Sequence, residues 1–432
     1  MLLPVIGYSV AGMRCKGRQR ITFPTLLACV CTCALAGGVL PQITVPAPTA
    51  AALALGHKFD LYWIAEKVLA LAIPFLFLFS GWGSRLCAIC KRIARGRWFL
   101  TVALFASIYV VLTILISLPL NYERHFVLPH AIGRSHQALT GWLGEQAVGM
   151  AVQVAGAALF IWIPYWMLAK SPRRWWLWGA AAMVPVVLLV LVIMPVWVNP
   201  LTNSYKPLEN KQLAAEIRSL AARCGVRDVP IVVGGDDTTV VGLGPTNRIV
   251  LQEDLAKIET DAQIRFTIGH ELKHYVMGDN WKALLIISVL LLAGFWLTDR
   301  VGRFAVARWH ARLGFKELKD PASLPLGVLC LTSLWLAVTP VFNAFSQHIE
   351  READRFGLEL TRENEAAATM FANWLAPGYD VADPGWFEQT FRSNHPSIGE
   401  RIRLANEYHP WINGAPLVYS KECKPSDDKH TR

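Results

Sequence analysis

The stretch WFLTVALFASIYVVLTILISL, residues Trp98–Leu118, holds no charged side chain. As a helix it is long enough to cross a hydrocarbon core about 30 Å thick, which takes about 20 apolar residues. The pattern recurs along the chain, and several runs end in Trp or Tyr, the usual interfacial anchors. We count seven such runs, near Ile21–Gly38, Trp63–Gly83, Trp98–Leu118, Gln146–Leu168, Trp175–Trp197, Ala283–Leu297 and Leu324–Phe345. The fold class that follows is a mainly α, polytopic membrane protein with about seven transmembrane helices.

Composition and charge agree with this class. Of 432 residues, 53% are hydrophobic and only 17% are charged, which argues against an ordinary soluble protein. The net charge of +10 comes from basic residues between the apolar runs, with no recognisable nucleic-acid-binding motif. Three short loops hold most of them, at Arg85, Lys91, Arg92, Arg95 and Arg97, at Lys170, Arg173 and Arg174, and at Arg300, Arg303, Arg308, Arg312, Lys316 and Lys319. We therefore expect the lipid bilayer and no nucleic acid as a partner, with the basic loops in the cytoplasm.

The first apolar run has two interpretations. Basic residues precede Ile21–Gly38, so this run fits either a cleaved secretory signal or a retained helix. We expect a retained helix in an integral, multi-pass protein of the bacterial inner membrane.

The nine cysteines indicate no disulfide framework. Four lie in apolar runs, at Cys29, Cys31, Cys33 and Cys330, and the others are scattered. Cys87 and Cys90 form a lone CxxC, which we interpret as incidental because no second pair stands at metal-binding spacing.

Polar sequence divides the chain into four parts. We expect 1–197 to hold the first five runs, 198–282 and 346–432 to form a water-soluble domain with a polar tail, and 283–345 to hold the last two runs. Within 198–282, a helical pattern ends at Gly225 and three short strand patterns follow. The strands are predicted at Val229–Val233, Thr239–Val241 and Arg248–Leu251. One helix is expected to continue from Asp261 to Leu297, and Lys421–Arg432 is polar enough to be disordered.

The chemistry centres on His270-Glu271-Leu272-Lys273-His274. On a helix, residues i and i+4 share a face, so both imidazoles can bind one ion while Glu271 flanks it. This HExxH pattern is typical of zinc metallopeptidases and makes the small α+β domain zincin-like. The alternative is a surface helix with two exposed histidines.

A catalytic zinc site needs a third protein ligand and one open position for water. Glu350 directly follows the last apolar run, on a helix that can return beside the sixth run, and it is the candidate that we favour. Glu352 and His348 are the alternatives, and a charged helix face is the interpretation without a metal. Asp354 lies one turn after Glu350, where a carboxylate can accept the remaining N–H of either histidine.

This residue set suits peptide hydrolysis by zinc-activated water. Zinc lowers the pKa of a bound water from about 15.7 to about 7, so hydroxide becomes available at neutral pH. Glu271 is then the general base and passes the proton to the leaving amine. The sequence therefore predicts a metalloendopeptidase with one Zn²⁺ per chain, held by His270, His274 and Glu350.

Further segments match the motifs of one known family. They are Pro200–Asn203 with Pro207-Leu208, Val240-Val241-Gly242-Leu243-Gly244 with Arg248–Leu251, Asn343 with the Glu350 segment, and His395-Pro396-Ser397 with Arg401-Ile402. In this order they resemble the linker, the substrate-edge hairpin, the SRxxExxAD motif and the HPxxxxRI motif of the CAAX prenyl protease type 1 family. The chain departs from that family at Lys273, where Gly is common, at Gln347, where Arg is usual, and at Asp237-Thr238-Thr239, where an Asn-Ala-Tyr-like stretch is common.

The resemblance implies zinc, a seven-helix barrel around a chamber, endoproteolysis of a peptide or protein and, in eukaryotic members, cleavage near a prenylated C-terminal Cys. It also implies that His395 and Arg401 face the cleft as catalytic residues that steady the oxyanion or the substrate backbone. The implied substrate contacts are Val241, Gly242, Leu243 and Asn343. A lipidated, membrane-proximal substrate is one form that such a peptide can take.

Orientation and reaction class leave alternatives open. Eukaryotic members keep the metal site in the cytosol, whereas the loop charges place 198–282 opposite the basic loops, and we favour the periplasmic side. A quality-control protease of the HtpX type has about four spans, and a site-2-type protease carries its motif inside an apolar helix with an Asp ligand. A non-catalytic transporter or receptor with a structural metal would have no use for Glu271.

Overall fold

The computed structural model describes residues 42–198, 204–235, 237–242, 246–375 and 379–424. Before residue 199 the helices are α1 (Ala50–Phe79), α2 (Trp82–Ile93), α3 (Trp98–Tyr122), η1 (Glu123–Val127), α4 (Leu128–Ala131), α5 (Leu139–Phe160), α6 (Trp162–Lys170), α7 (Trp175–Leu188) and η2 (Leu189–Val198). After residue 203 they are α9 (Lys211–Arg223), α10 (Glu253–Ile258), α11 (Asp261–Val276), α12 (Asp279–Leu313), η4 (Pro321–Ser323), α13 (Leu324–Thr361), α14 (Asn364–Trp374), η5 (Glu388–Arg392) and α15 (Ile398–Glu407). The strands are β1 (Lys206–Pro207), β2 (Ile231–Val233), β3 (Thr239–Val241) and β4 (Arg248–Leu251).

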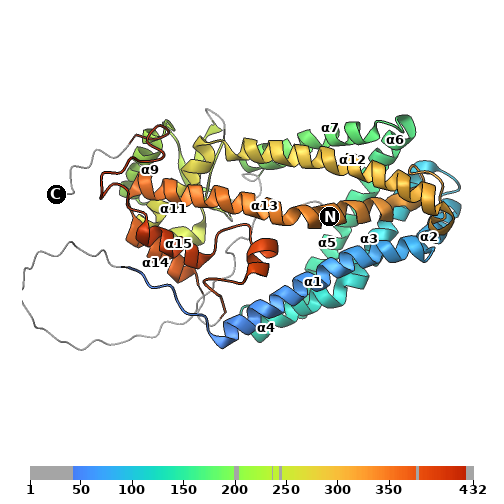
Figure 1. Cartoon of the computed structure of the whole chain (residues 1–432), viewed down its shortest axis with the longest axis horizontal. Coiled ribbons are helices and arrows are strands. Elements are labelled where there is room, and N and C mark those ends of the chain that lie inside the picture. The colour runs from blue at the N-terminus through green and yellow to red at the C-terminus, as the bar shows by residue number, and fades with distance from the viewer. Residues whose placement is uncertain (1–41, 199–203, 236, 243–245, 376–378, 425–432) are drawn as a thin grey trace, which may run out of the picture.

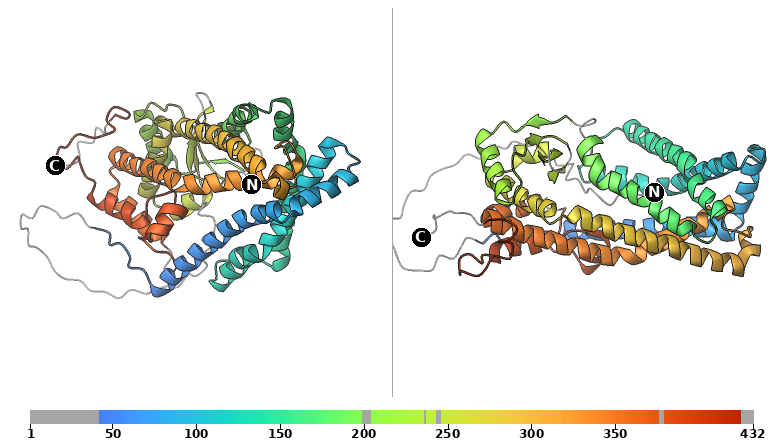
Figure 2. Two further views of the ribbon diagram at one scale, coloured as in Figure 1. Left: turned by 45° about the vertical axis from the view of Figure 1, so that its right-hand side comes forward. Right: turned by 90° about the horizontal axis from the view of Figure 1, so that it is seen from above.

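Two long helices, α12 and α13, lie side by side along most of the molecule (Figure 1). At one end of this pair lie α9, α11, α14, α15 and the sheet, and at the other end lie α2 and α6 (Figure 1). Figure 2 shows α1 and α3 leading away from the pair at an angle, with α7 covering α12. The polar parts of the chain therefore gather at one end of a long helical body.

Five helical stretches among the described residues are long and apolar enough to cross a membrane: Ala50–Phe79, Trp98–Ala131, Leu139–Lys170, Asp279–Leu313 and Pro321–Thr361. They coincide with the second, third, fourth, sixth and seventh predicted runs. The fifth run begins a shorter apolar helix, Trp175–Leu191, and the first run, Ile21–Gly38, lies outside the described residues. The membrane class is confirmed, and the predicted count of seven is not.

The prediction of one helix from Asp261 to Leu297 is wrong. Helix α11 ends at Val276, and α12 begins at Asp279 after Gly278, whose φ of 64° is left-handed. Glycine adopts this conformation without the steric cost that a Cβ adds, so it ends one helix and redirects the chain. The turn brings Asp279 back toward the end of α11.

The third basic segment is also helical rather than a loop. Helix α12 continues to Leu313, so Arg300, Arg303, Arg308 and Arg312 lie on its last turns. Arg303 pairs with the buried carboxylate of Asp299, which also accepts a hydrogen bond of 2.6 Å from Trp175 Nε1. Because Trp175 opens α7, these contacts hold α7 against α12. Arg85, Lys91 and Arg92 likewise lie on α2.

The four strands form one sheet in the order β1-β2-β4-β3. Strands β2 and β4 are parallel, whereas β1 with β2 and β3 with β4 are antiparallel. The three predicted strands are confirmed, and the short strand β1 was missed. Apolar residues of α9, the sheet, α11 and α13 form one core cluster, which includes Ile217, Ile249, Ile268, Leu272 and Phe356. Strand β3 lies at one end of the strand order and against α11.

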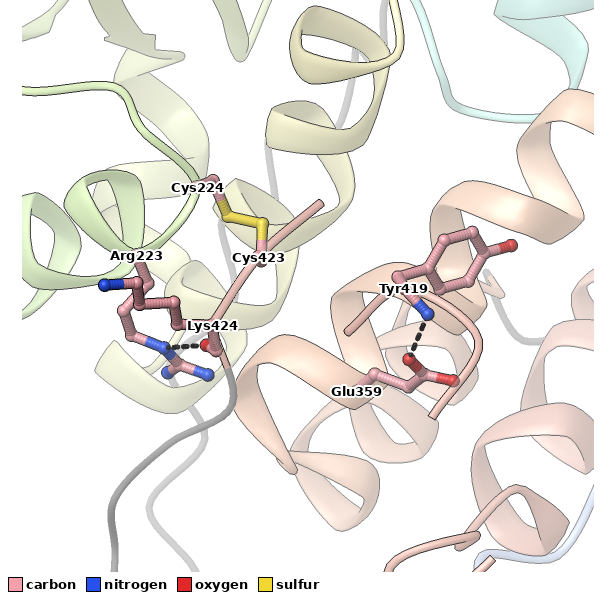
Figure 3. The surroundings of a disulfide bond; sticks show 6 residues. All are labelled: Arg223, Cys224, Glu359, Tyr419, Cys423 and Lys424. Atoms are coloured by element: carbon pink, nitrogen blue, oxygen red, sulfur yellow. Dashed lines mark hydrogen bonds between the residues drawn. A yellow bond between two sulfur atoms is a disulfide. The ribbon is translucent and has the colours of Figure 1, made fainter. Parts of the chain in front are cut away.

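A disulfide joins Cys224, at the C-terminal end of α9, to Cys423 (Figure 3). Backbone and side-chain hydrogen bonds between Arg223 and Lys424 extend the connection, and the Glu359 carboxylate accepts the Tyr419 N–H. The prediction that the cysteines form no disulfide framework therefore missed this bond. The expectation of disorder is wrong for 421–424, which are held in place, while 425–432 lie outside the described residues.

Candidate active site

The site forms where α11 and α13 cross in close contact, with a glycine on each helix at the crossing. A Cβ on Gly269 would stand 3.1 Å from the Gly357 Cα, and a Cβ on Gly357 would stand 3.1 Å from the His270 N. Contacts this close favour glycine on both helices, since a Cβ at either position would push the helices apart by a few tenths of an ångström. The crossing places His270 directly opposite the turns of α13 that carry Glu350 and Asp354.

Three predicted ligands converge at this crossing. His270 Nε2 lies 3.2 Å from His274 Nε2 and 3.2 Å from Glu350 Oε2. His274 Nε2 lies 3.6 Å from Glu350 Oε1. These three residues form the one His/Cys/Asp/Glu group suited to a metal ion within the described part of the chain. The alternatives Glu352 and His348 do not belong to it.

The other nitrogen of each ring faces a carboxylate. His270 Nδ1 lies 3.0 Å from Asp354 Oδ1, and His274 Nδ1 lies 2.9 Å from Asp279 Oδ2. Because an ionised carboxylate only accepts hydrogen bonds, each Nδ1 carries a hydrogen and each Nε2 is the nitrogen that can bind a metal ion or a proton. Two lone pairs and a carboxylate that face one another attract a cation.

The distances fit a zinc ion. Tetrahedral ligands at about 2.0–2.2 Å from zinc lie about 3.3–3.6 Å from one another. The two Nε2 atoms lie 3.2 Å apart, and the two oxygens of the Glu350 carboxylate lie 3.2 Å from His270 Nε2 and 3.6 Å from His274 Nε2, which is close to this spacing. Burial lowers the pKa of His270, but its hydrogen bonds with Asp354 and Glu350 raise that pKa to about 10 overall. In the absence of a metal, a proton therefore occupies this position.

Glu271 projects from α11 beside the ligands and is partly buried. Burial raises the pKa of its carboxyl, and the electrostatic effects of His270 and His274 act in the opposite direction. A carboxylate with a raised pKa is a stronger base than one in water, which suits general base catalysis near neutral pH.

His395 and Arg401, expected to face the cleft, have different surroundings. His395 Nε2 lies 3.5 Å from Glu350 Oε2, and its side chain is 49% exposed, so it stands at the rim of the metal-ligand group. Arg401 is buried and forms two hydrogen bonds with Asp354, of 2.8 and 2.6 Å. Its guanidinium therefore acts on Asp354, which in turn holds His270.

The expected substrate contacts lie nearby. Val241 ends β3, and both Val241 and Gly242 line a cavity of about 350 Å³ that also reaches His274, Tyr275 and Trp281. Leu243 lies outside the described residues. Asn343, also expected to bind substrate, is buried and donates a 3.0 Å hydrogen bond to the Thr390 carbonyl. Asn343 therefore anchors η5.

Sequence reasoning missed two residues of the site. Asp279 holds His274, and the signal for it was Gly278, a helix breaker that turns the following Asp back. Gln347 donates hydrogen bonds to the carbonyls of Gln389 and Ser393, of 2.7 and 2.9 Å, and so supports the loop before His395. Its signal was the departure from the usual arginine.

Family models and relatives agree with the geometry. The model for peptidase family M48 matches residues 207–409, and the model described as CAAX prenyl protease N-terminal, five membrane helices, matches residues 58–204. The uncharacterized metalloprotease YhfN of Bacillus subtilis is 32% identical over 341 residues, which cover 77% of this chain and 79% of that protein. The chain belongs to peptidase family M48. This M48 protein is an integral, multi-pass membrane metalloprotease, and the predicted family and enzyme class are confirmed.

More distant relatives of this M48 protein extend the match. The CAAX prenyl protease 1 homolog of Dictyostelium discoideum is 25% identical over 313 residues, covering 69% of this chain and 71% of that protein. The CAAX prenyl protease 1 of Saccharomyces cerevisiae is 24% identical over 331 residues, covering 69% and 70%. The crystal structure of S. mikatae Ste24p superposes with a TM-score of 0.66 at 20% identity, over 83% of this chain and 87% of that one, which shows a shared fold.

Proposed function

We propose that this M48 protein is a zinc endopeptidase in which His270, His274 and Glu350 hold one Zn²⁺ and Glu271 is the general base. The observation that carries the proposal is the match between the ligand spacings of 3.2, 3.2 and 3.6 Å and tetrahedral zinc. The chemistry of the donors adds support, since two imidazoles and one carboxylate are ligands that zinc prefers. We also propose that 198–282 and 346–432 together form a zincin-like metallopeptidase domain. The boundaries between this domain and the membrane helices then lie after residues 197 and 345.

Zinc bound there would supply Lewis acidity, lowering the pKa of a water molecule and polarising the scissile carbonyl. Glu271 accepts the proton of the attacking water and donates it to the leaving amine. His395, at the rim of the metal-ligand group, donates a hydrogen bond to the oxygen that becomes negative in the transition state. Burial lowers the pKa of His395, and its Nδ1 lies 2.7 Å from Asn394 Oδ1, so Nε2 is the nitrogen that faces the metal-ligand group. Arg401 keeps Asp354 ionised and aligned with His270.

The substrate that we propose is an extended peptide beside β3. An edge strand can pair with an added strand, and the cavity at Val241 and Gly242 leads from that edge to His274. Because the site stands at one end of the apolar helices, membrane-proximal peptides reach it readily (Figure 1). Relatives named CAAX prenyl protease suggest a lipidated, CAAX-type C-terminus as the substrate and a helical barrel with a chamber as its enclosure.

We further propose that the metal site faces the periplasm of a bacterial inner membrane. Disulfides persist in oxidising compartments, and Cys224–Cys423 lies in the same domain as the metal ligands. The basic residues of α2 and of the α6–α7 turn lie at the opposite end of the molecule (Figure 1), which the positive-inside rule assigns to the cytoplasm. Two independent observations thus favour one orientation.

The proposal is tested by zinc content and peptide cleavage in detergent. Glu271→Gln should retain one zinc and lose cleavage by about 10²-fold or more, since it removes only the base. Glu350→Ala should lose both zinc and cleavage, while Glu253→Gln, an exposed glutamate on α10, should change neither. A wild-type protein without zinc, or with full turnover in Glu271→Gln, contradicts the proposal.

Substrate class and orientation have separate tests. A lipidated peptide should be cut faster than the same peptide without lipid, and equal rates would refute the lipidated class. For orientation, thiols of the protein in intact cells are alkylated with a maleimide of high mass before and after reduction. Reduction should expose two more reactive thiols in the wild type and none in Cys423→Ser, whose Cys224 thiol is free before reduction. An unchanged wild-type pattern would overturn the periplasmic assignment.

A further inference from the structure

The side chain of Lys273 is fully buried within the metal-binding helix. A buried ammonium is costly unless each of its three N–H groups has an acceptor. Lys273 Nζ has three: Asp279 Oδ2 at 2.8 Å, the Ile349 carbonyl at 3.0 Å and Glu352 Oε2 at 3.3 Å. A charge that is buried and fully satisfied in this way fixes the groups around it.

The first of these groups is the carboxylate that holds the second histidine. Asp279 Oδ2 accepts from both Lys273 Nζ, at 2.8 Å, and His274 Nδ1, at 2.9 Å. Its other oxygen accepts from Lys282 Nζ at 2.9 Å, on the exposed side. Asp279 also opens α12, where a negative charge is favourable at a helix N-terminus. Lys273 thus shares the oxygen that sets the direction of the His274 ring.

The second group lies on the other helix. Ile349 directly precedes Glu350, so the bond from Lys273 to the Ile349 carbonyl fixes the backbone of α13 where it presents the third ligand. One side chain of α11 therefore contacts both the partner of His274 and the backbone beside Glu350.

We propose that Lys273 and Asp279 are a positioning pair for the metal centre: Asp279 orients His274, and Lys273 fixes Asp279 and the turn of α13 that carries Glu350. This inference rests on the proposed zinc site. It adds two residues that do not bind the metal themselves but hold its ligands in position. It is the counterpart of Asp354 and Arg401, which serve His270 in the same way.

The test measures zinc affinity of the full-length protein in detergent, by competition with a chromophoric chelator. Asp279→Asn keeps the volume and removes the charge, and Lys273→Met keeps the length and removes the ammonium. Each should weaken zinc binding by about 10–100-fold, the usual effect of removing a partner of a ligating histidine. Lys282→Met, which loses a contact to the same carboxylate from the exposed side, is the matched control and should change affinity less than about twofold.

A second readout separates positioning from general stability. With Co²⁺ in place of zinc, both variants should alter the visible d–d spectrum, whereas a purely structural role would lower the thermal stability of the metal-free protein and leave the spectrum unchanged. If Lys273→Met does not fold, Asp279→Asn decides the outcome alone. Wild-type affinity and spectrum in a folded Asp279→Asn, or equal losses in Lys282→Met, overturn the inference. A wild-type protein that binds no metal instead overturns the proposed function.

Discussion

Arg401 and Arg403 offer a direct comparison of a buried and an exposed ion pair on one helix, α15. Arg401 binds Asp354 through two hydrogen bonds of 2.8 and 2.6 Å, and the two side chains are 8% and 2% exposed. Arg403 binds Asp383 through two hydrogen bonds of 2.9 and 2.7 Å, and both side chains are 48% exposed. The pairs have the same chemistry and nearly the same geometry, and burial is the main difference between them; the Arg401 guanidinium also lies 4.1 Å from the centre of the Phe371 ring.

Replacement of each arginine by methionine should therefore have unequal effects. Arg401→Met leaves the Asp354 carboxylate buried beside His270 alone, and breaking a buried pair in this way costs about 3–5 kcal/mol of folding free energy. Arg403→Met leaves Asp383 in water and should cost about 0.2–1 kcal/mol. At 1.4 kcal/mol per factor of ten, the loss for Arg401 is two to four orders of magnitude in the folding equilibrium constant.

The assay is thermal unfolding of the metal-free variants in one detergent at one scan rate, followed by tryptophan fluorescence. Arg401→Met should unfold well below the wild type, and Arg403→Met should unfold close to it. Zinc affinity gives a second comparison, because only Arg401 acts through Asp354 on a metal ligand. Equal destabilisation by the two substitutions would refute the reasoning that burial makes the Arg401–Asp354 pair contribute more to stability than the Arg403–Asp383 pair.

Three further outcomes are expected. Gly269→Ala adds a methyl group 3.1 Å from the Gly357 Cα and should cost about 1–3 kcal/mol in a thermal unfolding measurement, whereas an unchanged midpoint would show that the helices can separate freely. Cys423→Ser should cost about 2–5 kcal/mol, and reducing agent should lower the wild type to the same level without affecting the variant. Because hydrogen bonds raise the pKa of His270 to about 10 against its burial, zinc must displace a proton below that pH. Zinc affinity in chelator competition should fall about tenfold per pH unit from pH 8 to 6, and a flat profile would contradict a protonated metal-free site.

Local spacing in the sequence was enough to select the three residues that we propose as metal ligands. His270 and His274 stand one turn apart on a helix, and Glu350 with Asp354 repeats that spacing on another, so each pair needs only helical geometry. What spacing could not decide was which histidine Asp354 serves. The answer depends on the crossing at Gly269 and on a second carboxylate, Asp279, whose position is set by a single left-handed glycine.

The disulfide was beyond the reach of the same reasoning. Cys224 and Cys423 are separated by 199 positions, and neither has a neighbouring cysteine that would mark a framework. The two cysteines come together because the C-terminal segment packs against α9 and α13. Glu359 of α13 accepts a hydrogen bond from the backbone N–H of Tyr419 there. Contacts of this kind are tertiary, so the hydrophobic periodicity within either segment does not indicate them.

The two histidines are held by chains of the same kind that come from different parts of the fold. His270 is held by Asp354 and then Arg401, from α13 and α15, and His274 is held by Asp279 and then Lys273, from α12 and α11. Helices α12 and α13 continue from these contacts into two of the apolar spans. The ligand geometry is therefore fixed only when the membrane helices are packed against each other. A polar fragment without α12 would retain both histidines and lose the carboxylate that orients one of them.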